Sequence, residues 1–508
     1  MKNIKLKITN FNEKIINFFN KIPSFNKFKS SKLIKISRFN KILIFLIALL
    51  FLYLFYLSIP SLYDKGRVQK HLSDYILKEF NINLSLSSDI KYSILPSPHI
   101  VIKNAKIFSN DSSNVNEISQ IKKLKIFISQ KTLFKSLFDE KKIKINKILI
   151  ENANFLVNAD NLKYYNNFIN NKLSEKKIKV LKSNFFYKND KNETISIFYI
   201  SEIKLYYLKE KLINQLLIKG ETYKFPFNIK WNKDFKLGGK KITNFKVKKL
   251  GLEIKNISEI KEKKHFGDNV IYIKNIKLNT KYELDDNKLD FISKELKSKS
   301  EIPYYNGEIL FNPFNLELDL TLPKISIKEI LNIGNFFNEI LKTNLLFNQN
   351  ISTTININSE KITSKKIFDN FKLSLKINNG KIDFDNSFFV SKKIGSLTLK
   401  DSSIFIKKNQ LIFNGSFNFQ VNNQENFYKS FQISKKNRKP IKDIFFEIDM
   451  NFINNDLQVK NVRINEGDII TTDKFERFLS DMNNVDLSNK NWIYIKRFTN
   501  KIFQNYDG

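Results

Sequence analysis

Apolar and polar residues alternate with a period of two along most of the chain after residue 81. The alternation begins at Ile82, Leu84 and Leu86 and returns in many later runs. Such runs are typical of strands with one apolar face and one wet face. Short connectors such as Asn414-Gly415 suit tight turns between antiparallel strands. The pattern therefore predicts a mainly β fold: a long antiparallel sheet, curved or folded into a trough, with a few short helices.

Helical spacing of apolar residues occurs in only a few places. Val68, Leu72 and Ile76 predict a helix over 65–80. Similar spacing predicts helix at about 328–346 and in a helical tail, 471–508, and we also expect a short helix at about 131–139. The strand runs fall into two predicted β regions, 64–260 and 301–470, and we expect the charged stretch 261–300 to link them.

Residues 42–63 carry no charge and form the most apolar segment of the chain. A bilayer core takes about 20 apolar residues as a helix, so this segment predicts a transmembrane span. A cleaved signal peptide would have an apolar region of about 7–15 residues followed by a small-residue cleavage site. Here the run is longer and no Ala-x-Ala follows it. A buried core helix is the other alternative. We expect a retained, single-pass anchor.

The charge beside this span predicts its orientation. Residues 1–41 carry ten Lys, Arg38 and one acid, Glu13, which gives a net charge of +10. Cytoplasmic flanks of membrane spans are enriched in Lys and Arg. We therefore expect 1–41 to be a basic cytoplasmic arm and the bulk of the chain to lie across the membrane.

The whole chain is strongly basic, with a formal net charge of +37 over 508 residues. The excess comes from 81 Lys against only six Arg. Lys has AT-rich codons, so a biased genome accounts for much of it. A surface that binds phosphates would also be enriched in Arg, whose planar fork matches phosphate oxygens. We therefore expect no nucleic-acid partner.

The sequence contains little material for catalysis. It has no Cys, which excludes disulfides, thiolate metal sites and cysteine nucleophiles. His71 lies in a predicted helix, His99 opens a strand and His265 is placed in a charged loop, and none belongs to a nucleophile motif. Gly238-Gly239 lacks the remaining residues of a phosphate loop and fits a hairpin turn better. We expect no catalytic, cofactor or metal site, and no enzymatic activity.

The apolar face of so long a sheet must be covered by something. A closed sandwich would bury it completely, whereas an open trough would leave an apolar channel that acyl chains can fill. Alternation alone fits both arrangements. The candidate residues of an apolar groove come from successive strands: Ile100, Ile126, Ile145, Leu318, Leu375 and Phe417.

The order of these elements resembles the AsmA family of Gram-negative bacteria. The resemblance rests on the span, the helix after it, the turn Ile94-Leu95-Pro96-Ser97-Pro98, the strand that follows from His99, and the block 121–157. The later block 371–465 is similar to the family's C-terminal region, including Asn379-Gly380-Lys381-Ile382.

The resemblance implies a protein of the bacterial inner membrane with a β-rich periplasmic body and a role in outer-membrane biogenesis. Three functions follow as hypotheses. The first is a groove that binds or conducts phospholipid acyl chains. The second is a scaffold or assembly factor for outer-membrane proteins, with envelope proteins bound on the same sheet. The third is a structural protein of the envelope with a closed core.

Overall fold

The computed structural model divides the chain into two compact units, Met1–Ile59 and Pro60–Gly508. The structure describes residues 38–109, 116–133, 143–189, 192–261, 264–274, 276–285, 287–294, 303–343, 345–363, 368–452, 456–465, 467, 469–470, 473–483 and 492–506. The first unit is thus described only by its last residues.

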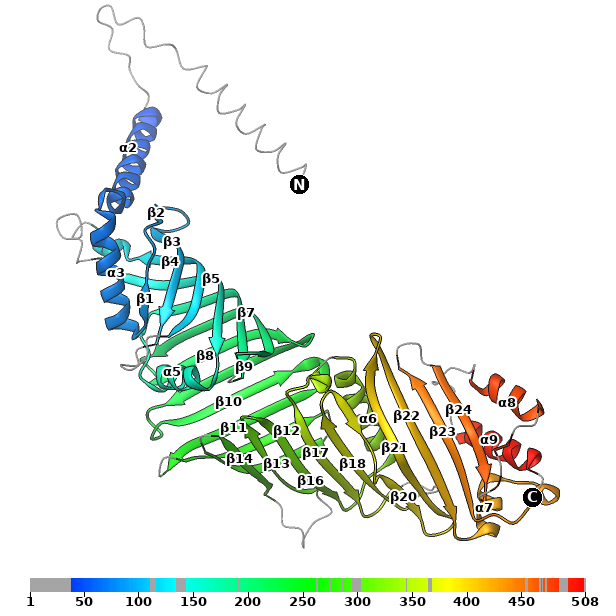
Figure 1. Cartoon of the computed structure of the whole chain (residues 1–508). Helices are drawn as coiled ribbons and strands as arrows, with labels where there is room; N and C mark the ends of the chain where they lie inside the picture. Colours follow the sequence, from blue (N-terminus) through cyan, green and yellow to red (C-terminus); the bar gives the residue numbers. More distant parts are fainter. Residues whose placement is uncertain are drawn as a thin grey trace, which may run out of the picture. The chain divides into compact units, whose positions relative to one another are not determined.

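The first unit contains the predicted anchor. Helix α2 spans Arg38–Ser58, and the 3-10 helix η1 spans Ile59–Leu62 (Figure 1). Among the described residues, Phe39–Leu62 is the one helix long and apolar enough to cross a membrane. This finding agrees with the single-pass anchor expected at 42–63.

The second unit begins with the predicted helix at 65–80. Helix α3 spans Lys65–Phe80; its N-cap, Asp64, accepts a hydrogen bond from the backbone N–H of Arg67 at 2.8 Å. Asn81 ends the helix in the left-handed conformation, with φ 54°. The apolar stripe of α3, spaced at three to four residues, is buried: Val68, Leu72, Ile76 and Phe80.

Twenty-four strands of the described chain form one sheet, which confirms the predicted mainly β fold (Figure 1). The first eight are β1 (Asn83–Ser85), β2 (Ile90–Ser93), β3 (His99–Phe108), β4 (Glu117–Ile128), β5 (Ile145–Val157), β6 (Lys177–Lys188), β7 (Thr194–Leu208) and β8 (Ile213–Thr222). The next eight are β9 (Phe225–Asp234), β10 (Lys240–Val247), β11 (Leu252–Lys261), β12 (Lys264–Ile273), β13 (Ile276–Leu284), β14 (Lys288–Ser293), β15 (Tyr304–Phe311) and β16 (Phe314–Leu322). The last eight are β17 (Ser352–Ser359), β18 (Asn370–Asn378), β19 (Lys381–Asp383), β20 (Phe388–Ser391), β21 (Gly395–Lys407), β22 (Gln410–Val421), β23 (Asp443–Asn451) and β24 (Asp456–Ile464).

The sheet is antiparallel at all but two of its described junctions. Strand β6 pairs parallel to β5, and β17 pairs parallel to β16. Helix α5 (Ala159–Asn170) lies between the first pair in the chain, and α6 (Ile327–Leu341) between the second. The purely antiparallel expectation is wrong at these two junctions, because a parallel neighbour needs a crossover connection and a helix supplies it.

Helices differ from the predicted set in two places. Helices α5 and α7 (Gln424–Phe431) were not expected, since both are short and rich in polar residues; each begins at an Asn N-cap whose side chain accepts a backbone hydrogen bond. The expected helix at about 131–139 is represented by the 3-10 turn Gln130–Thr132, and its later residues lie outside the described part. Helices α8 (Asp473–Asn483) and α9 (Trp492–Asn505) occupy the predicted tail.

The stretch 261–300 differs from the linker expected there. Strands β12, β13 and β14 lie within it and pair with each other and with β11 and β15. The sheet therefore continues from one predicted β region into the other. His265, which was expected in a loop, lies in β12. The many polar residues at the start of this strand hide the alternation that would have predicted it.

One irregularity crosses β3 to β7 at the same level of the sheet. In each strand two successive residues replace one in the alternation, and Asn104, Asn152 and Lys182 take left-handed φ values of 54°, 56° and 50°. The irregularity ends at the pairing of β7 with β8, where β7 has a bulge between Ile200 and Glu202. Bulges bend and twist strands, so this line is a built-in bend that keeps the apolar residues on one face.

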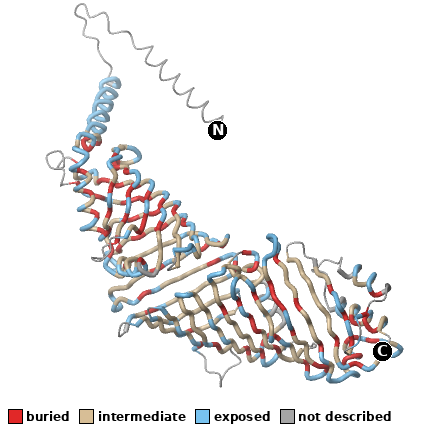
Figure 2. Tube along the Cα trace, viewed as in Figure 1, coloured by how far each residue is buried: buried red, intermediate tan, exposed pale blue. Residues whose placement is uncertain are grey.

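The buried core is concentrated at the two ends of the sheet (Figure 2). Near α3, the side chains of Ile102, Leu124 and Ile126 are at most 1 % exposed. At the other end, helices α7, α8 and α9 pack with β22–β24 around Phe427, Phe475 and Phe503. A smaller cluster joins Leu341, at the end of α6, to Leu375 and Ile382.

Candidate apolar path on the sheet

One face of the sheet is apolar along almost its whole extent, and we call it the apolar face. Its clearest feature is a row of directly paired residues that crosses eleven strands, β3 to β13. Every member of this first row is apolar: Ile102, Leu124, Ile150, Val180, Ile203, Ile218, Ile229, Phe245, Ile254, Ile271 and Leu278. Paired residues project from the same face of a sheet, so these side chains form a continuous line.

A second row begins on β13, where the first one ends, and continues to β24. Its members are Leu284, Leu289, Ile309, Leu316, Thr353, Ile377, Ile382, Ile404, Phe413, Met450 and Leu457. Thr353 is the one polar member. The two rows together place apolar side chains on the same face from β3 to β24.

The opposite face, the polar face, carries the ion pairs between strands. Lys125 Nζ lies 3.0 Å from Glu151, Lys179 Nζ lies 2.7 Å from Glu202, and Lys246 Nζ lies 3.1 Å from Glu253. Each of these residues is offset by one position from the first row, which places it on the other side of the pleat. These three lysines therefore lie on the polar face, each beside a carboxylate.

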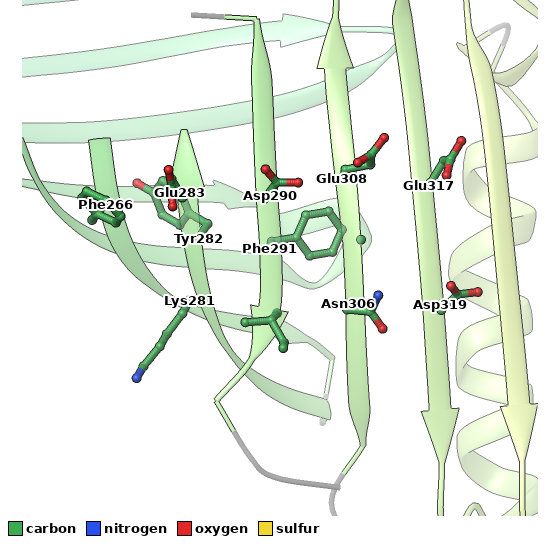
Figure 3. Close-up of a pocket in the computed structure, with 12 residues that line it drawn as sticks. Phe266, Lys281, Tyr282, Glu283, Asp290, Phe291, Asn306, Glu308, Glu317 and Asp319 are labelled. Atoms are coloured by element: carbon green, nitrogen blue, oxygen red, sulfur yellow. The ribbon is translucent and has the colours of Figure 1, made fainter. Parts of the chain in front are cut away.

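Acidic residues also form a row on the polar face. Glu283, Asp290, Glu308 and Glu317 are direct partners on β13, β14, β15 and β16 (Figure 3). Lys288 Nζ lies 2.7 Å from Glu308 and 3.0 Å from Asp290, which offsets part of the repulsion. Among the described residues, no group of three or more His, Asp or Glu side chains is arranged to hold a metal ion.

The apolar face is only half-buried in its middle, across β11 to β16, which we call the open segment. Ile254, Ile271 and Leu278 of the first row are all half-exposed there. So are the apolar members of the same face that follow: Leu284, Leu289, Phe291, Ile309, Leu316, Leu318 and Leu320. By contrast, Ile102 and Leu124, at the other end of the first row, are at most 1 % exposed.

A few polar groups interrupt the open segment and satisfy one another. Asn256 Nδ2 donates to Asn269 Oδ1 and to the Tyr282 hydroxyl, each at 2.8 Å. The Thr280 and Tyr305 hydroxyls lie 2.6 Å apart. These polar groups thus form hydrogen bonds with one another within the sheet, which lowers the free-energy cost of placing them beside apolar neighbours.

Two glycines of the open segment make room for aromatic rings. A Cβ at Gly267 would lie 2.4 Å from the ring of Tyr282, and one at Gly307 would lie 2.6 Å from Phe291. Each ring lies across the strand that carries the glycine, as the ring of Phe291 does in Figure 3. These positions need glycine because of close approach, and the rings widen the apolar surface.

The six candidate groove residues all lie on the apolar face by register. Ile100 pairs with Ile126, and Ile145 reaches the same face through its pairing with Ile128. These three are buried at the α3 end, at 3 % exposure or less.

The other three candidates lie farther along the same face. Ile355 pairs with both Leu318 and Leu375, which brings these two residues together across β16–β18. Leu375 is buried in the cluster beside α6, whereas Leu318 lies in the open segment and is half-exposed. Phe417 pairs with Phe446, and their rings stack with centroids 5.3 Å apart. That these residues line a lipid path stays a prediction.

Three basic residues on the apolar face were not singled out from the sequence. Lys233 and Lys241 are direct partners on β9 and β10, and His265 lies two strands away on β12. Burial, together with the nearby Lys233, lowers the pKa of Lys241 to about 8. Burial and Lys241 lower the pKa of His265. The sequence did contain a signal that Lys241 lies on the apolar face: it alternates in step with Phe245 and Val247 in the same strand.

An apolar helix long enough to cross a membrane precedes one long sheet with distinct apolar and polar faces, and these two features define the class of protein: a β-sheet protein with a candidate membrane span. The family model of the AsmA family matches residues 36–204, from the anchor to β7. The predicted resemblance is confirmed over this region, which is AsmA-like. At the level of the family, the AsmA match is linked to envelope or outer-membrane biogenesis or lipid transport. No curated protein matches the chain. The resemblance expected for 371–465 lies beyond the match and stays a prediction.

Proposed function

We propose that this protein binds phospholipid and conducts its acyl chains along the apolar face of the sheet, without enzymatic chemistry, in outer-membrane biogenesis. The anchor holds it in the bacterial inner membrane, with the N-terminal arm in the cytoplasm and the sheet in the periplasm. The net charge of +10 before the span supports this orientation.

The observation that carries the proposal is the half-exposure of apolar side chains across the open segment. Apolar surface in contact with water costs about 25 cal/mol per Å² compared with burial. A folded protein rarely leaves a contiguous apolar patch uncovered unless a ligand, membrane or partner covers it. Acyl chains fit this surface because they are apolar and flexible, and because the rows offer length instead of a closed pocket.

The continuity of the two rows supports conduction over simple binding. Five inter-strand steps of about 4.8 Å give the accessible part of the first row, from Ile218 on β8 to Leu278 on β13, a length of about 24 Å. A chain that moves along this accessible part exchanges one apolar contact for a nearly identical one, so no step there requires a large loss of binding free energy. The members of the row from Ile102 to Ile203 are at most 5 % exposed, so the proposed path does not include them.

Site-specific photo-crosslinking in cells tests the proposal. Leu278 in the open segment is replaced by p-benzoylphenylalanine, and Ile257, which is 52 % exposed on the polar face, receives the same replacement as the matched control. We expect phospholipid adducts at position 278 and few or none at 257. Equal labelling of both positions, or no lipid adduct at 278, contradicts a lipid path on the apolar face.

A scaffold for outer-membrane proteins is the second candidate, and the edge of β24 favours it. Among the described pairings, β24 pairs with β23 alone. An edge strand can accept an added strand from a partner protein. In the same experiment this function predicts protein adducts at the apolar face and at β24, in place of lipid adducts.

A further inference from the structure

A group of basic side chains interrupts the apolar face at the level where β9 and β10 meet in a hairpin. Lys233 and Lys241 lie directly opposite each other, so their Cβ atoms are separated by about 5 Å. Lys241 also pairs with Ser258, and Ser258 with Gly267, which leads to His265 two residues along β12. Like charges in directly opposite positions destabilise a sheet, so this arrangement calls for a compensating group.

The protein does not supply that group in its described residues. Lys233 Nζ donates to the backbone carbonyl of Asn170 at the end of α5, at 2.7 Å. Lys241 is only 7 % exposed, and within the described part of the chain it has no hydrogen-bond or ion-pair partner. Long charged side chains are almost never buried to this degree without a partner.

Carboxylates are present nearby but on the wrong side of the sheet. Those described on β8–β12 all have polar-face parity: Glu221, Asp234, Glu253, Glu259 and Asp268. Glu253 and Glu259 are positioned for Lys246 and Lys240, which share that face. The groups that face Lys241 across the apolar face are therefore Lys233 from β9 and His265 from β12, both basic, with Ser258 from β11 between them.

We propose that Lys233, Lys241 and His265 form an anion site that holds the phosphate of an anionic phospholipid while its acyl chains lie on the first row. The site rests on the proposed function for the identity of its ligand. Phe245 of the first row lies four residues from Lys241 on the same strand, a distance of about 13 Å. An acyl chain whose headgroup is held at Lys241 is long enough to reach Phe245 and the apolar side chains beyond it.

The chemistry selects a phosphate-bearing amphiphile over a neutral one. Hydrogen bonds from an ammonium to a phosphate are charge-assisted and stronger than neutral ones. A zwitterionic headgroup carries its own cation beside the phosphate, which the basic cluster repels. We expect the order of binding to be phosphatidylglycerol first, phosphatidylcholine second and diacylglycerol last.

Binding to the full-length protein in detergent tests the site, with fluorescent lipids of identical acyl chains as probes. Phosphatidylglycerol should bind at least about tenfold more tightly than diacylglycerol, as expected from charge-assisted bonds. Lys241→Met should reduce this ratio at least about fivefold and leave diacylglycerol binding unchanged. Lys246→Met, which removes an ion-paired lysine from the polar face of the same strand, is the matched control and should keep the wild-type ratio.

The pH dependence provides a second readout that a merely structural role would not produce. The pKa of Lys241 is about 8, so its charge is lost as the pH rises through that value. The preference for phosphatidylglycerol should fall between pH 7 and pH 9 in the wild type and in Lys246→Met, and should fall much less in Lys241→Met, where Lys233 is the remaining lysine of the site and burial lowers its pKa as well.

The outcomes separate the site from the proposed function. An unchanged ratio in Lys241→Met, while diacylglycerol still binds, overturns the anion site and leaves the apolar path standing. Failure of every lipid to bind overturns both the proposed function and this assignment. Glycerol phosphate that binds with the same dependence on Lys241, and displaces phosphatidylglycerol as effectively as the lipid itself, assigns the site to a free phosphate and overturns the lipid headgroup.

Discussion

At the scale of single residues, Lys241 shows how burial changes the chemistry of an ordinary side chain. Its pKa is about 8 in the folded protein and 10.5 in the absence of the fold. Below pH 8 both states are charged, so the folded state carries the full cost of a buried ammonium. Between pH 8 and 10.5 the folded state is neutral while the unfolded state is still protonated, so stability rises with pH.

Lys241→Met should therefore stabilise the full-length protein at pH 7 by about 1–3 kcal/mol. The difference from wild type should shrink as the pH rises from 8 toward 10.5. Thermal unfolding in detergent at a series of pH values measures both effects. A variant less stable than wild type at pH 7 would mean that Lys241 has a stabilising partner.

At the scale of elements, alternation predicted individual strands well but not their neighbours. Leu318 and Leu320 predict one face of β16, and local spacing predicts the helix that follows it, but no local pattern shows that this helix returns the chain parallel to β16 as β17. Helix α5 was missed because its sequence is rich in Asn and Tyr. Ile100, Ile126 and Ile145 have the spacing of a half-exposed face, and only tertiary contacts around α3 decide that they are buried.

Helix α3 should therefore matter to the stability of the sheet that follows it. Leu72 is 0 % exposed, whereas Leu77 on the same helix is 44 % exposed. Leu72→Ala should cost about 2–5 kcal/mol, because it removes buried methyl groups and leaves a cavity. Leu77→Ala is the control and should change stability by less than about 1 kcal/mol. Chemical denaturation of the two variants decides the point, and equal losses would contradict the packing of α3.

At the scale of the whole molecule, the proposed function requires that the anchor crosses the membrane and that the sheet lies on its periplasmic side. The proposed orientation leaves residues 64–508 outside the cytoplasm. External protease added to spheroplasts should digest this part and leave a short anchored fragment. Protection of the large C-terminal part, with a cytoplasmic marker equally protected, would reverse the orientation.

The central claim is that the apolar face carries acyl chains, and lipid transfer by paired variants tests it most directly. Ile271 and Leu278 are direct partners in the open segment, and Ile242 and Ile257 are direct partners on the polar face. Replacing each pair with two Asp residues adds the same charges to opposite faces of neighbouring strands. Because Ile271 and Leu278 are only partly buried and Ile242 and Ile257 are exposed, we expect both double variants to fold and insert.

The decisive measurement is the rate at which the full-length protein moves labelled phospholipid between donor and acceptor vesicles. The double variant Ile271→Asp, Leu278→Asp should lose most transfer, at least about tenfold, because carboxylates in contact with acyl chains are costly. The double variant Ile242→Asp, Ile257→Asp should keep the wild-type rate. Wild-type transfer by a correctly folded Ile271→Asp, Leu278→Asp protein would contradict the path.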